Sequence, residues 1–146
     1  MSTAIKLTVR QCLEIHRALN SLDAVRSGKD ELIAMEFTGV IRAKLMANAQ
    51  ALEPIRFAHE ATDRALAKQH GVYQGIEESP ENARKVDAYK RAVEDALDLE
   101  VEVQMHRIAL TALLNRPGDG KTIRTNPVPQ SLLNKLAPIL DFNPDE

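Results

Sequence analysis

Residues 97–106 read Leu-Asp-Leu-Glu-Val-Glu-Val-Gln-Met-His, with an apolar residue at every odd position and a polar residue at every even one. This period of two is typical of a strand with one buried face, and we predict a strand over 99–106. Residues 4–8, Ala-Ile-Lys-Leu-Thr, alternate weakly and are its natural partner, because an isolated strand leaves its backbone groups without hydrogen bonds. No helix breaker precedes residue 97, so a continuation of the preceding helix is the alternative.

Away from this stretch, apolar residues recur at the three-and-four spacing of amphipathic helices. Thr8 with Gln11 has the pattern of a capping box, and Ser79-Pro80 is a typical helix start. Three prolines and two glycines lie between residues 115 and 129 and indicate a loop. These signals predict helices over 9–22, 80–98 and 130–140, and a loop over 115–129.

A long helix is predicted in the first half of the chain. Asp30 and Glu31 suit the positive end of a helix, and the apolar spacing then continues to about residue 70. We predict one helix over 30–70, kinked near Pro54, which lacks a backbone donor. With helix 80–98 it forms a long antiparallel hairpin packed like a short coiled coil. The expected fold is mainly α: this hairpin, a short helix at each end and a minor two-stranded β element, in a single domain over 1–146.

The composition supports a helical core and argues against nucleic acid as a partner. Of 146 residues, 44% are hydrophobic but only 3% are aromatic, so the core is aliphatic. Few aromatic residues also means few stacking platforms for single-stranded nucleic acid. The net charge of -2 gives no general attraction to phosphate backbones. A helix-turn-helix over the first two helices is disfavoured, because Asp30 and Glu31 would face phosphates.

The chain has no recognisable catalytic or metal motif. Pro117 to Thr122 ends like a phosphate-binding loop, but Asn115 stands where the first glycine is required. His59 and Asp63 match two positions of a zinc-protease helix whose second histidine is missing. We therefore expect no catalytic residue, no metal and no cofactor. The cations that we predict to line an anion or nucleotide site are Arg116, Lys121 and Arg124.

Cys12 and His16 lie on the apolar face of helix 9–22, and we expect both to be core residues. A single cysteine excludes an intramolecular disulfide. No stretch approaches the 18 or so apolar residues of a membrane span, and the N-terminus lacks a secretory signal. We expect a protein of the cytosol.

Four pieces of the chain resemble a group of small bacteriophage proteins of unknown function that contain a long helical hairpin. These pieces are Ile5–Thr8, Arg17–Leu22, Leu99–Val103 and Leu132–Ile139. The resemblance implies a phage-encoded structural or interaction protein, located in the host cytoplasm or in the virion. It transfers no catalytic residue, and it does not include the loop over 115–129.

The long helix also predicts association. A helix over 30–70 would be roughly 60 Å long, too long to hide its apolar face inside one small monomer. We expect a homo-oligomer with Phe37, Ile41, Leu45 and Leu52 at its interface. The acidic run from Glu94 to Glu102 is an ordinary solvated face or a surface for a basic partner.

Two functions follow from these features. The first is a non-enzymatic protein that self-associates through its hairpin and acts in virion assembly or binds a host factor. The second is an oligomer that sequesters a nucleotide signal of bacterial immunity through its cationic loop. Gene neighbourhood would separate a virion component from an early host-interference protein.

The scarcity of aromatic residues makes Phe37 a sensitive position. If its side chain is buried, Phe37→Ala lowers the free energy of unfolding by about 3–5 kcal/mol, because the substitution leaves a cavity. A thermal melt measures this. An unchanged melting temperature would show that Phe37 is exposed and available as an interface contact.

Overall fold

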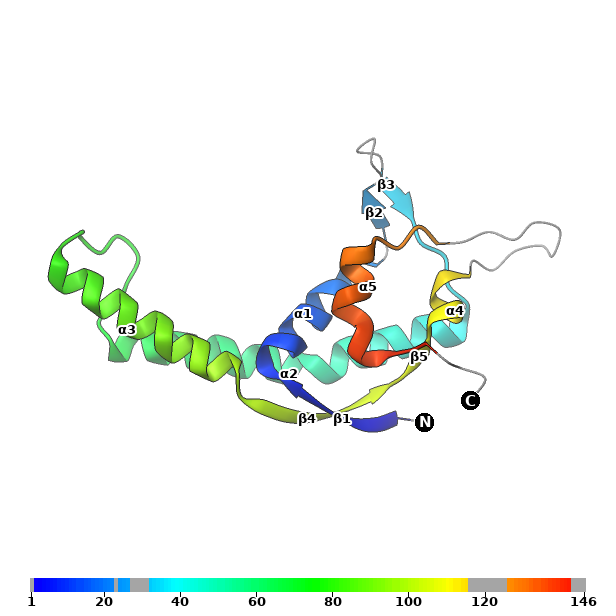
Figure 1. Ribbon diagram of the computed structural model, residues 1–146, viewed down its shortest axis with the longest axis horizontal. Coiled ribbons are helices and arrows are strands. Elements are labelled where there is room, and N and C mark those ends of the chain that lie inside the picture. The colour runs from blue at the N-terminus through cyan, green and yellow to red at the C-terminus, as the bar shows by residue number, and fades with distance from the viewer. Residues whose placement is uncertain (1, 23, 27–31, 116–125, 143–146) are drawn as a thin grey trace.

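The computed structural model describes residues 2–22, 24–26, 32–115 and 126–142. Within them the chain is mainly helical, with three short pairs of strands (Figure 1). In chain order the elements are β1 (Ser2–Thr8), α1 (Val9–Asn20), β2 (Ala24–Arg26), β3 (Leu32–Ala34), α2 (Gly39–Gln69), α3 (Pro80–Leu97), β4 (Glu100–His106), β5 (Ile108–Ala109), α4 (Leu110–Leu114), α5 (Gln130–Leu136), a 3-10 turn (Ala137–Ile139) and β6 (Leu140–Asp141). None of the described helices is apolar enough over a sufficient length to cross a membrane.

The predicted strand pair is present. β1 and β4 pair antiparallel over seven residues each, with Ile5 opposite Val103 and Leu7 opposite Val101. The helical alternative for this stretch is wrong, because α3 ends at Leu97 and Asp98 caps it. The alternation sorts most of the side chains as expected, since Ile5, Leu7, Val103 and Met105 are all buried. Leu99, predicted to start the strand, lies just before β4 and is 62% exposed.

The junction between β1 and α1 follows the local sequence. The Thr8 hydroxyl accepts a hydrogen bond from the Gln11 backbone N–H, and the Gln11 side chain accepts one from the Thr8 N–H, at 2.9 Å. This capping box ends the strand and starts the helix at one residue. The helix then buries Cys12 and His16, as predicted.

The start of the long helix differs from the prediction. α2 begins at Gly39 and not at residue 30, because Thr38 is its N-cap and accepts a hydrogen bond from the Ile41 N–H. The preceding chain is extended: β3 pairs antiparallel with β2, and Met35 and Phe37 are buried on either side of the exposed Glu36. Ile33 and Phe37 are four residues apart, which is also a helical spacing, so the spacing alone does not distinguish the extended chain from a helix.

Pro54 does not end α2, which runs as one helix to Gln69. The kink near Pro54 therefore stays a prediction. The last predicted helix is shorter than expected, because α5 ends at Leu136 and gives way to a 3-10 turn that contains Pro138. After this turn β6 pairs parallel with β5, which brings the C-terminal segment beside the end of β4.

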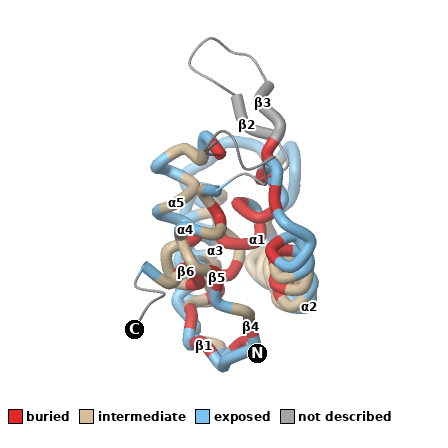
Figure 2. Tube along the Cα trace, turned by 90° about the vertical axis from the view of Figure 1, so that its right-hand side faces the viewer, coloured by how far each residue is buried: buried red, intermediate tan, exposed pale blue. Residues whose placement is uncertain are grey.

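The core lies where α1, the first half of α2, the β1–β4 pair and α5 meet. In Figure 2 the buried positions gather on the facing sides of α1 and α2 and around β5. Phe37, Ile41, Leu45 and Leu52 all belong to this core, each at most 8% exposed. The predicted interface set is therefore packed inside the single chain, and its role at an interface between copies stays a prediction.

Two buried asparagines connect this core through backbone hydrogen bonds. Asn48 of α2 is fully buried, and its amide donates to the His106 carbonyl at 2.8 Å and accepts from the His106 N–H at 2.7 Å. Asn126 makes the same two bonds to the backbone of Glu36, at 2.8 and 3.0 Å, and a third to the Leu113 carbonyl. Each side-chain amide thus replaces a missing neighbouring strand.

Asn48→Leu keeps the branched side chain of four heavy atoms but removes both bonds to His106. We expect the free energy of unfolding to fall by about 2–4 kcal/mol, because a buried N–H and a buried carbonyl lose their partners. Chemical denaturation measures the change. Asn134→Leu, on the exposed side of α5, is the control and should change stability by no more than about 0.5 kcal/mol. Equal stability of Asn48→Leu and the wild type would contradict the role of this amide.

Candidate functional site

The second half of α2, the connecting residues and α3 form an arm that projects from the core (Figure 1). We define the arm as residues 53–99. All of them are described by the structure, and none is buried; the last buried residue before them is Leu52. α3 lies beside the second half of α2, and the Tyr89 hydroxyl donates a hydrogen bond to the Asp63 carboxylate. This bond raises the pKa of Tyr89, because it favours the protonated phenol.

Polar contacts join the arm to the core at its base. Arg10 forms ion pairs with Glu94 and with Asp98, the latter at 3.6 Å. His16 Nε2 lies 2.6 Å from Glu53 Oε1. The pKa of Glu53 is lowered first by its hydrogen bond with Arg56 and then by the one with His16. Two members of the acidic run over 94–102 are therefore engaged by a basic residue of the same chain.

The outward side of α2 carries a continuous exposed stripe. Its members follow three-and-four spacing along the helix and are all exposed. They are Ala43, Met46, Gln50, Pro54, Phe57, Ala61, Arg64 and Lys68. We call this set the outer stripe. It is centred opposite the buried positions Ile41, Leu45, Asn48 and Leu52 of the same helix.

Met46 and Phe57 are the two large apolar members of the outer stripe, 58% and 57% exposed. They are eleven residues apart, which is about three turns and about 16 Å along the helix. The Arg56 guanidinium lies 4.5 Å from the centre of the Phe57 ring. Two carboxylates hold that guanidinium in place, Glu53 at 2.8 Å and Glu60 at 2.7 Å. The ring is thus presented on the surface beside an ordered cation, and aromatic and Arg residues are enriched at binding hot spots.

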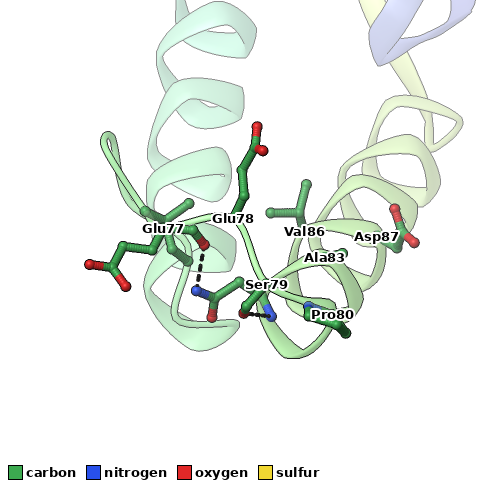
Figure 3. A pocket seen from close by; sticks show the side chains of 9 residues that line it. Glu77, Glu78, Ser79, Pro80, Ala83, Val86 and Asp87 are labelled. Atoms are coloured by element: carbon green, nitrogen blue, oxygen red, sulfur yellow. Dashed lines mark hydrogen bonds between the residues drawn. The ribbon is translucent and has the colours of Figure 1, made fainter.

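The far end of the arm has a groove of 580 Å³ (Figure 3). Its lining combines apolar side chains with three carboxylates: Ile76, Pro80, Ala83, Val86, Glu77, Glu78 and Asp87. The groove is shaped by local capping, because the Ser79 hydroxyl accepts from the Asn82 N–H and the Asn82 amide donates to the Glu77 carbonyl. Glu78 lies between α2 and α3 beside Val86, whereas Glu77 and Asp87 lie on opposite sides.

A second hollow, of 450 Å³, lies between α1 and α2 at the base of the arm. It contains His16, Arg17, Arg56, His59 and Glu60 among its lining residues. Its charges are largely compensated, because Arg56 already binds two carboxylates. The hollow is therefore a weak candidate for an anion site.

The sequence-predicted chemistry finds little support in the described residues. No group of three or more His, Cys, Asp and Glu side chains among them could hold a metal ion. Asp63, half of the incomplete zinc-protease motif, instead accepts the Tyr89 hydrogen bond. Arg116, Lys121 and Arg124 lie outside the described residues, so the predicted anion site stays a prediction.

Compared with known proteins, the chain matches no protein family, no curated sequence and no solved structure. The function of this protein must therefore be inferred from the residues that its own surface exposes. Sequence reasoning missed the outer stripe, because it considered only the apolar positions Phe37, Ile41, Leu45 and Leu52 as contacts. The eleven-residue interval between Met46 and Phe57 was a usable signal, since it returns to the same side of a helix.

The buried thiol of Cys12 gives a direct test of core packing around the first turn of α1. Burial raises the pKa of Cys12 to about 11, so at about pH 8 only about one thiol in a thousand is a thiolate. We expect a thiol reagent to label the folded protein far more slowly than the denatured chain, which should bind one equivalent at once. Rapid labelling of the folded protein would contradict the burial of Cys12.

Proposed function

We propose that this protein is a non-enzymatic interaction protein that self-associates through its two-helix arm, with the outer stripe of α2 as the contact. One observation carries the proposal: Met46 and Phe57 stand exposed on the side of α2 opposite its buried side. Large apolar residues aligned on one exposed helix face are typical of an interaction site. Helices 39–69 and 80–97 act in this proposal as the hairpin that the sequence predicts.

The outer stripe is complementary to itself when two copies pack antiparallel. A two-fold axis that crosses the outer stripe at the level of residues 51 and 52 brings Met46 of each copy onto Phe57 of the other. Contacts between sulfur and an aromatic ring contribute about 0.3–1.5 kcal/mol each. The same axis brings Ala43 near Ala61, and such small residues let two helices approach closely. A second copy is therefore the partner that this face fits best.

The biological setting that we propose follows the resemblance to small phage proteins. The self-associated protein would act in virion assembly or bind a host factor, in the host cytoplasm or in the virion. The groove of Figure 3 lies beyond the outer stripe, at the far end of the arm, and stays free for a phage or host protein. The nucleotide-sequestering alternative depends on Arg116, Lys121 and Arg124, outside the described residues.

Phe57→Glu tests this function. The side chain is exposed, so the fold should persist, but a buried carboxylate would oppose association. We expect a lower molar mass than wild type at the same micromolar concentration, measured by light scattering or sedimentation. Tyr73→Glu is the matched control, because Tyr73 is an aromatic residue of similar exposure outside the outer stripe. Its mass should equal that of the wild type.

Two results would overturn the proposal. One is a wild-type protein that stays monomeric throughout the micromolar range. The other is a Phe57→Glu variant with the mass of the wild type. A circular dichroism spectrum of each variant shows whether the helices are intact.

A further inference from the structure

The β1–β4 pair has two outer edges, and among the described residues no strand pairs with the edge of β1. In an antiparallel pair, alternate residues direct both backbone groups to the partner strand, and the others direct them away. Thr8 belongs to the second set, because its N–H bonds to the Gln11 side chain and not to β4. The register places Ser2, Ala4 and Lys6 in the same set. All three are exposed, and no described residue hydrogen-bonds to their outward backbone groups.

The edge of β4 is different. The outward backbone groups of His106 are both bonded to the amide of Asn48. His106 and Thr8 lie at opposite ends of the ladder, and both direct their backbone N–H away from the partner strand. The two observations therefore give the same assignment of inward and outward residues. Further along the same edge stand the exposed Glu102 and Glu100. This edge is thus capped at one end and negatively charged at the other, which disfavours pairing with its own copy.

We propose that the outer edge of β1 binds the same edge of a second copy of this chain, giving a four-stranded antiparallel sheet. A two-fold axis at Ala4 places Ala4 opposite Ala4 and Lys6 opposite Ser2. This register pairs every outward N–H and carbonyl of Ser2, Ala4 and Lys6, which makes six hydrogen bonds between the copies. Adding a strand to an exposed sheet edge is a recurring mode of protein recognition.

Charge and size favour a second copy as the occupant. Lys6 is the only charged residue of β1, and the register keeps the two Lys6 side chains apart. Within its own chain Lys6 lies opposite Glu102, so the edge of β1 carries little net charge. Ser2 and Ala4 are small and exposed and do not obstruct a neighbouring strand. The buried side of the sheet would continue across the axis, from Ile5 of one copy to Thr3 of the other.

This contact is independent of the outer stripe of α2. Two different two-fold contacts on one chain produce a closed tetramer or an open chain of dimers. Either contact alone gives a dimer. The masses of single and double variants therefore distinguish a failure of the β1 contact from a failure of the proposed function.

Ala4→Pro is the decisive variant. Its N–H points away from β4, so proline at this position should preserve the β1–β4 pair while it blocks the outer edge. Gln104→Pro is the matched control, because Gln104 also directs its N–H away from its partner, on the edge of β4. We expect Ala4→Pro to reduce the wild-type assembly to the dimer held by the outer stripe, and Gln104→Pro to leave the molar mass of the wild type unchanged. Combined with Phe57→Glu, Ala4→Pro should give a monomer.

Amide hydrogen exchange of the wild type gives an answer that needs no variant to fold. The amides of Ala4 and Lys6 should be protected at high protein concentration and exchange rapidly at low concentration. The amides of Ile5 and Leu7, which bond to β4, should stay protected at both. The proposal is overturned if Ala4 and Lys6 exchange rapidly at every concentration. An unchanged mass of Ala4→Pro, or an equal loss in Gln104→Pro, would overturn it as well.

Discussion

The arrangement of this protein depends on the buried amide of Asn48. It lies on the inner side of α2 beside Leu45 and Leu52, where water is excluded. A buried amide without partners destabilises a fold by several kilocalories per mole, so α2 is stable only where the amide meets a backbone N–H and carbonyl. His106, at the end of β4, supplies both. These two bonds, together with the burial of Leu45 and Leu52 on the same side, define the rotation of α2 and its position along β4.

Asn126 makes equivalent side-chain hydrogen bonds to the backbone on the other side of the core. Its amide pairs with the backbone of Glu36, in the extended segment that leads into α2, and also reaches the carbonyl of Leu113. The segment before α2 is thereby held without a third strand. Both asparagines satisfy extended backbone where the described part of the chain forms sheets of only two strands each. Apolar burial alone, which has no direction, would not specify these positions.

With the inner side of α2 fixed, its outer side is determined too. The outer stripe with Met46 and Phe57 faces away from the core because Asn48 faces into it. Beyond Leu52 the arm is joined to the core by polar pairs, such as His16 with Glu53 and Arg10 with Glu94. Isolated helices gain little stability in water without packing, so the contacts between α2 and α3 matter for the arm.

The sequence alone determined the local features whose causes lie within a few residues. The capping box at Thr8, the start of α3 at Ser79-Pro80, the alternation of β4 and the core position of Cys12 all follow from short-range pattern. The pairing of β4 with β1 followed as well, because a strand needs a partner for its backbone groups and residues 4–8 also alternate.

Only the tertiary structure decided the start of α2, the inward position of Phe37 and the outward position of Phe57. Residues 32–37 fit a helix and an extended chain equally well by spacing, and the choice is made by β2 and by Asn126, distant in sequence. Both faces of α2 carry apolar residues at helical intervals, so periodicity identifies two sides without saying which is buried. The hydrogen bonds of Asn48 help to select the buried side. They join residues 58 positions apart, so no local pattern reveals them.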